Sequence, residues 1–324
     1  MFIQILILFI GLALILGGAN ALTDGASAIA RRLGISDLII GLTVVAFGTS
    51  APELVISVLS AISGSAPLAI GNVVGSNIFN ILVIIGVTAM VRPMVISRSV
   101  MSLEIPMVIL SSLILLLLGN SGLIDGTGIN QVSRVSGIFL LILLLLFMRY
   151  TFASAKNPKN TVNADQSAAN VKTIPVWRAI IYVIFGLAAL IYGGELFVDG
   201  ASGIATRLGV SQAVIGLTIV AAGTSLPELA TSVVAAIKGK HAMAIGNVIG
   251  SNIFNVLMVL GVSATITPLS FGSIGNLDLL TLFAASVAFW VFGWLFKTRT
   301  ITRAEGTVLT LGYIAYISAL LAAI

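Results

Sequence analysis

The feature that most constrains the fold of this chain is a series of apolar runs, each about 20 residues or longer, the length that crosses the hydrocarbon core of a bilayer. Ten runs follow one another, at 2–30, 36–62, 67–91, 101–119, 135–152, 176–205, 211–237, 242–267, 276–296 and 304–323. Backbone polar groups in lipid must be satisfied within the protein, so these spans are predicted to be helices. The weak alternation of a transmembrane β-barrel is missing. The sequence predicts an all-α polytopic membrane protein with ten transmembrane helices.

Charge is scarce for a chain of 324 residues. Lys and Arg number 16, Asp and Glu number 11, and charged residues make up 8% of the chain, against about 25% in soluble domains. This leaves too little polar surface for a soluble enzyme, a disordered chain or a nucleic-acid-binding protein. The chain has no Cys, so disulfides, thiolate metal sites and Cys nucleophiles are excluded. It begins apolar, without a basic segment, so a cleaved signal peptide is not expected.

The basic residues divide unequally between the two sides that ten spans define. Only Arg134 and Arg207 fall on one side. The other side holds the remaining fourteen: Arg31, Arg32, Arg92, Arg98, Arg149, Lys156, Lys159, Lys172, Arg178, Lys238, Lys240, Lys297, Arg299 and Arg303. Cytoplasmic loops carry the Lys and Arg excess. We therefore expect a plasma (inner) membrane protein with both termini outside.

The chain is also an internal repeat. GLTVVAFGTSAPELVISV at 41–58 matches GLTIVAAGTSLPELATSV at 216–233 in 13 of 18 positions, and GNVVGSNIFNILVIIGV at 71–87 matches GNVIGSNIFNVLMVLGV at 246–262 in 12 of 17. Both alignments use an offset of 175 residues. A polar segment, 153–175, reads as a cytoplasmic linker between a first five-helix repeat, 1–152, and a second, 176–324.

Five spans per half is an odd number, so the second half must enter the membrane from the opposite side. The predicted architecture is therefore two inverted five-helix repeats. Inverted repeats are typical of secondary transporters, in which the substrate site lies near the bilayer midplane between the copies.

The motif GTSxPE carries the chemistry in each copy. Pro removes a backbone donor and Gly permits unusual dihedral angles, so the motif should break a helix near mid-membrane. We expect the break to leave carbonyls unpaired around Ala46, Phe47, Ala221 and Ala222. Glu53 and Glu228 follow directly. A carboxylate at that depth costs about 2.5–3.5 kcal/mol on the insertion scale, and a bound cation would remove this cost. A neutral, hydrogen-bonded structural Glu is the alternative.

The motif GNxxGSNIFN follows on the next helix. Asn72, Ser76 and Asn80 fall at i, i+4 and i+8 and form a polar stripe, which Asn247, Ser251 and Asn255 repeat. The stripe could bind an ion, or it could supply hydrogen bonds that only hold helices together. Two further positions, Asn77 and Asn252, point off the stripe and are interpreted as structural. The motif also contains GxxxG spacings, which allow helices to approach closely.

Carboxylates, hydroxyls, carboxamides and freed carbonyls are all hard oxygen donors. Such a set suits Ca²⁺ or Na⁺ and argues against Zn²⁺ or Cu⁺. These transported ions are the expected ligands, with no cofactor, and the lipid bilayer is the expected surrounding. No obligatory protein partner is evident.

With these paired motifs the chain resembles the cation/Ca²⁺ exchanger superfamily, and the resemblance covers essentially its whole length. It implies export of Ca²⁺ driven by Na⁺ entry through alternating access, in which the first and sixth helices slide over a fixed core. It implies that the ion ligands fall on Ala46, Thr49, Ser50, Glu53, Ser76 and Asn80, and on Ala221, Thr224, Ser225, Glu228, Ser251 and Asn255. Metal ligation centres on Glu53, Glu228, Thr49 and Thr224.

One position departs from the pattern. Position 255 is Asn, whereas many relatives, including the potassium-dependent branch, have Asp there; this argues against K⁺ co-transport. The coupling ion has an alternative, because paired deep carboxylates could exchange H⁺ instead of Na⁺. An intramembrane hydrolase would need a catalytic dyad or a zinc site at depth, but the single His lies in a loop and no Lys lies within a span. An enzyme is therefore not expected.

Overall fold

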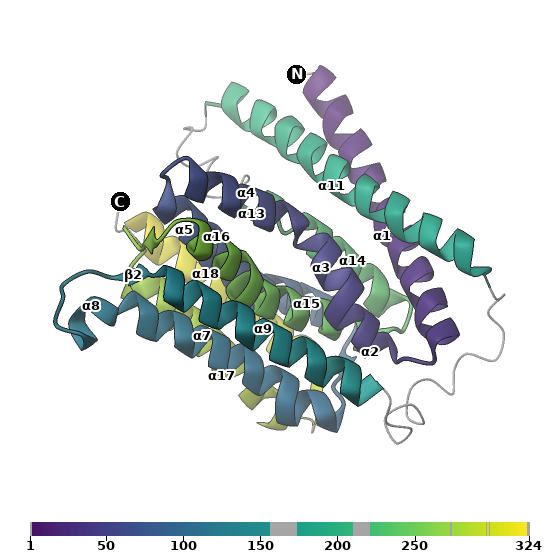
Figure 1. Ribbon diagram of the computed structural model, residues 1–324. Coiled ribbons are helices and arrows are strands. Elements are labelled where there is room, and N and C mark those ends of the chain that lie inside the picture. The colour runs from purple at the N-terminus through teal and green to yellow at the C-terminus, as the bar shows by residue number, and fades with distance from the viewer. Residues whose placement is uncertain are drawn as a thin grey trace. The chain divides into compact units, whose positions relative to one another are not determined.

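The computed structural model describes residues 2–155, 174–209, 221–272, 274–295, 297 and 299–322, and these residues are mostly helical (Figure 1). Eight helices in this part of the chain are long and apolar enough to span a membrane. Five are continuous: α1 (Phe2–Leu33), α9 (Arg134–Ala155), α11 (Val176–Arg207), α17 (Asn276–Leu295) and α18 (Arg303–Ala322). The described part of the chain is therefore mostly helical, with several helices of membrane-spanning length and apolar composition, as predicted.

Three further spans contain π-helical segments, in which each turn holds an extra residue. They are α5, η2 and α6 (Ala66–Phe79, Asn80–Ile85, Gly86–Val91), η3 and α7 (Val100–Glu104, Ile105–Gly119), and α15, η5 and α16 (His241–Phe254, Asn255–Leu260, Gly261–Ile266). Two of the π segments begin at the predicted site residues Asn80 and Asn255. Single π turns inside α-helices are frequent at functional sites.

Two predicted spans are broken. The first, 36–62, comprises α2 (Asp37–Ile40), η1 (Gly41–Val45), α3 (Ala46–Thr49) and α4 (Ala51–Ile62), and counts as a ninth span if its two parts are taken together. The second, 211–237, lies partly outside the described residues. Its described part comprises α13 (Ala221–Gly223) and α14 (Leu226–Ile237).

The repeat offset seen in the sequence recurs in the element boundaries. Each of α4, α5, η2 and α6 begins and ends 175 residues before α14, α15, η5 and α16, respectively. The short strand β1 (Met94–Val95) likewise precedes β3 (Leu269–Ser270) by 175 residues. Equivalent sequence thus folds equivalently in both halves around the predicted site.

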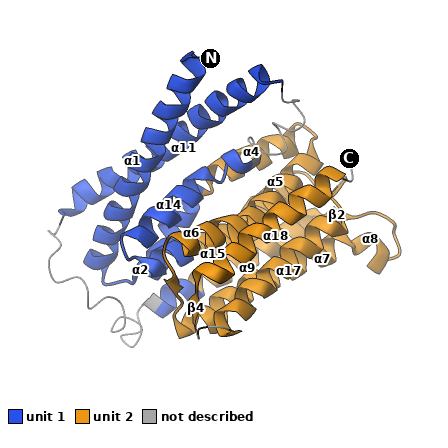
Figure 2. Ribbon diagram, turned by 180° about the vertical axis from the view of Figure 1, so that it is seen from behind, with its two compact units in different colours: residues 1–49, 150–247 blue, residues 50–149, 248–324 orange. Residues whose placement is uncertain are grey.

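The helices form two compact units, and each unit combines segments from both halves of the sequence (Figure 2). Unit 1 contains residues 1–49 and 150–247, and unit 2 contains residues 50–149 and 248–324. The predicted division at 1–152 and 176–324 describes the order of the repeats along the chain and stays a prediction.

Unit 1 is dominated by α1 and α11, which lie side by side (Figures 1 and 2). They are joined by a seam of glycines that places backbone against backbone. A Cβ added at Gly18 would lie 2.8 Å from the Gly186 carbonyl oxygen, and one added at Gly11 would lie 2.7 Å from that of Gly193. The partner number falls as the α1 number rises, so the two helices are antiparallel. The seven-residue spacing of the glycines keeps them on one helix face.

Unit 2 contains two short ribbons. Strand β1 pairs antiparallel with β4 (Thr300–Ile301), and β2 (Gln131–Val132) pairs antiparallel with β3. Each ribbon therefore joins a loop of the first half to a loop of the second. The short helix α8 (Ser121–Ile124) precedes β2.

In unit 2, helices of one half of the sequence also pack on helices of the other half. Helix α18 packs on α6, and its Arg303 donates from Nε to the Met90 carbonyl at 3.1 Å. Arg134, at the start of α9, likewise donates to the Ile266 carbonyl at the end of α16, at 3.3 Å. Each arginine therefore satisfies a carbonyl that the end of a helix leaves free.

Candidate cation-binding site

Both copies of GTSxPE break the helix, as predicted. Ser50 has φ −85° and ψ 7°, and Ser225 has φ −93° and ψ 7°. Both lie in the sparsely allowed bridge region. A new helix follows each serine, with Pro in its first turn and Glu53 or Glu228 just after it. Both glutamates are only 1% exposed. Their position in a first helical turn is favourable for a carboxylate, because the helix dipole is positive there.

The prediction of unpaired carbonyls at the break is wrong for two of the four positions. The Ala46 carbonyl lies 3.4 Å from the Thr49 hydroxyl and shares its single hydrogen with Asn247 Oδ1, and the Ala222 carbonyl accepts the Ser225 amide at 3.2 Å. At each break, therefore, a residue three positions further along the chain hydrogen-bonds to one of these carbonyls. Each carbonyl oxygen still has a second lone pair.

In unit 1, Asn247 connects the two broken segments. Its Nδ2 donates to the Glu228 carbonyl at 3.3 Å and to Ser232 Oγ at 3.1 Å, and its Oδ1 accepts the Thr49 hydroxyl at 3.2 Å. Asn247, Ser232 and Thr49 are fully buried or nearly so. The side-chain amide of Asn247 therefore binds both the Glu228 backbone and the Thr49 side chain.

In unit 2, Asn72 makes the equivalent bonds from the other copy. Its Nδ2 donates to the Glu53 carbonyl at 3.3 Å and to Ser57 Oγ at 3.0 Å. The Ser57 hydroxyl in turn reaches the Ala69 carbonyl at 3.5 Å. The first residue of the polar stripe therefore fixes the helix that carries the carboxylate, on both copies.

The remaining stripe residues, Ser76, Asn80, Ser251 and Asn255, are all in unit 2 and are at most 2% exposed. Buried polar atoms are normally hydrogen-bonded. Within the part of the chain that the structure describes, however, Ser76 Oγ, both amide atoms of Asn80 and Asn255 Oδ1 have no partner. Buried oxygens without a protein partner are what a cation ligand set requires.

The two asparagines interpreted as structural do join helices. Asn77 donates from Nδ2 to the Asn252 carbonyl at 3.2 Å, and Asn252 donates to the Val248 carbonyl of its own helix at 2.8 Å. Asn77 also accepts the Nδ2 of Asn255 at 3.0 Å. Sequence reasoning did not find this last contact, because its offset of 178 residues joins non-equivalent positions in the two copies of the motif.

The twelve predicted ligand residues divide evenly between the units. Unit 1 holds Ala46, Thr49, Ala221, Thr224, Ser225 and Glu228, and unit 2 holds Ser50, Glu53, Ser76, Asn80, Ser251 and Asn255. Among the described residues, no group of three or more His, Cys, Asp or Glu side chains could hold a metal ion.

The glycines of the GxxxG spacings differ in how closely a neighbouring segment approaches them. A Cβ at Gly246 would lie 2.6 Å from the Leu38 carbonyl oxygen, so α15 and α2 are in backbone contact there. A Cβ at Gly75 would have no atom within 4 Å, so the expected close approach at that glycine is wrong.

Comparison with known proteins identifies the family of this chain. A family model described as "Sodium/calcium exchanger protein" matches residues 3–153 and 178–322. The chain belongs to the sodium/calcium exchanger family. It is 39% identical over 322 residues to the protein CaxA of Alkalimonas amylolytica, covering 98% of each chain. It is 31% identical over 347 residues to the sodium/calcium exchanger MaX1 of Methanosarcina acetivorans, covering 97% of each.

The solved structures agree. The sodium-calcium exchanger NCX_Mj, soaked with Na⁺ and Ca²⁺, superposes with a TM-score of 0.81 at 32% identity, covering 98% of each chain. Membership of the sodium/calcium exchanger family makes this chain a multi-pass integral membrane protein and a cation/Ca²⁺ antiporter rather than an enzyme. It also implies Ca²⁺ and Na⁺ as substrates.

Proposed function

We propose that this exchanger moves Ca²⁺ against Na⁺ by alternating access, through ten transmembrane helices arranged as two inverted five-helix repeats. Glu53 and Glu228 share the bound Ca²⁺, with Thr49 and Thr224 beside them. The other predicted ligands, from Ala46 and Ser50 to Ser251 and Asn255, complete this site and the neighbouring Na⁺ sites. Occupancy by one ion excludes the other because the carboxylates are shared.

The observation that carries this proposal is the pair of buried glutamates at matching helix breaks. Burying a carboxylate away from water is costly. Each unit nevertheless buries a glutamate, in a helix whose backbone is fixed by an asparagine of the GNxxGSN motif. A cation offsets the cost of both. The unpartnered oxygens of Ser76, Asn80 and Asn255 supply further hard ligands.

The inverted arrangement is supported by the ribbons of unit 2. Charge distribution puts the loops of β1 and β4 in the cytoplasm and the loops of β2 and β3 outside. The structure pairs β1 with β4 and β2 with β3. Each ribbon thus joins two loops of the same predicted side. The two stretches matched by the family model, 3–153 and 178–322, correspond closely to the proposed repeats.

Coupling to Na⁺ rather than H⁺ is favoured by the relatives named as sodium/calcium exchangers, MaX1 and NCX_Mj. It is also favoured by hydroxyls beside each carboxylate, since hydroxyl oxygens bind Na⁺ but are not needed to carry a proton. A proton-coupled exchange on the same fold predicts a different ion dependence.

The test is Ca²⁺ uptake into proteoliposomes with the Na⁺ and pH gradients imposed separately. We expect uptake to follow the Na⁺ gradient and to survive collapse of the pH gradient. Uptake that follows only the pH gradient would establish H⁺ coupling instead. Glu53→Gln should be inactive, and Asp125→Asn, which alters an exposed loop carboxylate, serves as the matched control.

A further inference from the structure

The two asparagines that begin the π segments are held differently, although they occupy equivalent places in the repeats. Asn255 donates from Nδ2 to Asn77 Oδ1 at 3.0 Å. Within the described residues, neither amide atom of Asn80 has a partner. Both side chains are 1% exposed, so solvent does not account for the difference.

A short chain of hydrogen bonds fixes the orientation of the Asn255 amide. Asn77 Nδ2 donates to the Asn252 carbonyl at 3.2 Å, so the Asn77 amide cannot reverse without placing one carbonyl oxygen against another. Its Oδ1 is therefore presented to Asn255 and can only accept. Asn255 must in turn present Nδ2 to Asn77, which turns its Oδ1 away. That Oδ1 is buried and has no partner in the part of the chain described.

The first repeat lacks the equivalent constraint. The counterpart of Asn77 is Asn252, and its Nδ2 donates to Val248 of its own helix at 2.8 Å. No bond from Asn252 reaches Asn80, and the Asn252 Oδ1 is also without a partner among the described residues. The repeat thus preserves the residue types at both positions but orients the amide at only one.

We propose that Asn77 is a positioning residue that presets Asn255 as an oxygen ligand and makes this position selective for Asn over Asp. The inference rests on the proposed function insofar as the ligand is a transported cation. Asn255 offers a preset oxygen, whereas Asn80 takes its orientation from what it binds. An ionised Asp at 255 has no hydrogen to give to Asn77, so two oxygens would face each other at about the distance of the present bond.

The first test measures equilibrium binding of ⁴⁵Ca²⁺ to the purified full chain alongside flux. Asn77→Leu removes both polar atoms and keeps the branched shape and the number of side-chain heavy atoms, and Asn77→Ala is the second variant. We expect the Ca²⁺ half-saturation concentration to rise about tenfold in each, the scale of one lost orienting hydrogen bond, with the maximal flux changed less than twofold. Asn252→Ala is the matched control, because it removes an equally buried amide that forms no hydrogen bond with the Asn255 side chain; it should stay within about twofold.

A double-variant cycle separates positioning from general damage. If Asn77 acts through Asn255, then adding Asn77→Leu to Asn255→Ala should leave Ca²⁺ binding unchanged. The proposal is overturned if the two effects multiply, or if Asn77→Leu binds Ca²⁺ like the wild type.

The selectivity claim has its own comparison. Asn255→Asp should bind Ca²⁺ at least fivefold more tightly when combined with Asn77→Ala than on its own, because the opposing oxygen is gone. An Asn77→Ala change that weakens Asn255→Asp as much as it weakens the wild type would contradict the selectivity. If the wild-type chain binds Ca²⁺ but does not exchange it for Na⁺, the proposed coupling is refuted. The binding tests above would still decide the role of Asn77.

Discussion

The two copies of the repeat share the frame of the candidate site, meaning the broken helices and the asparagines that anchor them. They differ in some of the side-chain contacts around it. Both break at a serine with nearly the same dihedral angles, and both fix the glutamate helix through an asparagine and a serine hydroxyl. They differ in the amide of Asn255 and in surface charge. Identical sequence preserves local backbone structure, whereas side-chain partners depend on tertiary contacts, which differ even between equivalent asparagines of the two copies.

The largest expected effect tests the shared frame. Glu53→Gln and Glu228→Gln should each lower Na⁺-driven Ca²⁺ flux by about 100-fold or more, because each removes one of two charges from a buried site. Flux in proteoliposomes, corrected for the amount of protein inserted, measures this. Equal losses support sharing of one ion by both carboxylates. If either variant retained near-normal flux, the two glutamates would not have equivalent roles.

The second prediction concerns the seam between α1 and α11, where the copies meet as partners. Gly18→Ala should destabilise the protein by about 1–3 kcal/mol, because its Cβ would lie 2.8 Å from the Gly186 carbonyl oxygen. Gly17→Ala is the neighbouring control, since a Cβ there meets nothing within 4 Å and Ala favours a helix. Thermal unfolding in detergent should show a lower Tm than the wild type for the Gly18→Ala variant only. Equal Tm values for the two variants would show that α1 and α11 can move apart to accommodate the added Cβ without loss of stability.

The third prediction compares the two anchoring asparagines. Asn247→Ala should cost more stability than Asn72→Ala, about 2–3 against about 1–2 kcal/mol, because Asn247 also accepts the Thr49 hydroxyl. Thermal unfolding of both variants side by side gives the order. Thr49→Val should remove most of the difference between them. The reverse order would mean that the Thr49 bond contributes little.

Much of the frame could be predicted from the sequence. Apolar runs gave the spans because lipid requires continuous apolar length, and the Gly and Pro pattern located the break at Ser50, since both residues act on their own backbone. The buried glutamates were found because a carboxylate at depth is expensive.

Other features depend on contacts that the sequence does not encode locally. The π segments at Asn80 and Asn255 arise where a helix gains a residue per turn under tertiary packing. The glycines at 11, 18 and 25 have a visible spacing of seven, but their partners lie in the other half of the chain. Likewise, Asn77 and Asn255 meet through the fold, and no spacing rule reports which way an amide faces.

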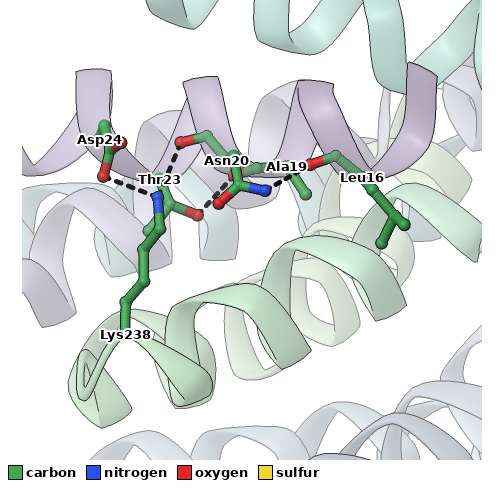
Figure 3. A network of polar contacts seen from close by, with 6 residues as sticks. All are labelled: Leu16, Ala19, Asn20, Thr23, Asp24 and Lys238. Carbon is green, nitrogen blue, oxygen red and sulfur yellow. Dashed lines mark hydrogen bonds and ion pairs between the residues drawn. The ribbon is translucent and has the colours of Figure 1, made fainter. Parts of the chain in front are cut away.

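Surface charge provides the smallest difference between the copies. Lys238, at the end of α14, donates from Nζ to Asp24 Oδ1 at 2.8 Å and to the Asn20 carbonyl at 3.2 Å, and so joins α14 to α1 (Figure 3). The repeat equivalents are Ser63 and Asp199, so the position equivalent to Lys238 carries no charge. The side chains are 25% and 45% exposed, respectively, so water and salt screen the pair.

Lys238→Ser, which gives the second copy the residue of the first, should therefore cost less than about 1 kcal/mol. The loss should be measurable as a lower Tm in about 50 mM salt and should shrink in about 500 mM salt, because screening already weakens the pair in the wild type. Asp24→Asn should produce the same loss, and the double variant no more than either single one. A loss that is independent of salt would mean that Lys238 acts through the Asn20 carbonyl and its packing rather than through charge.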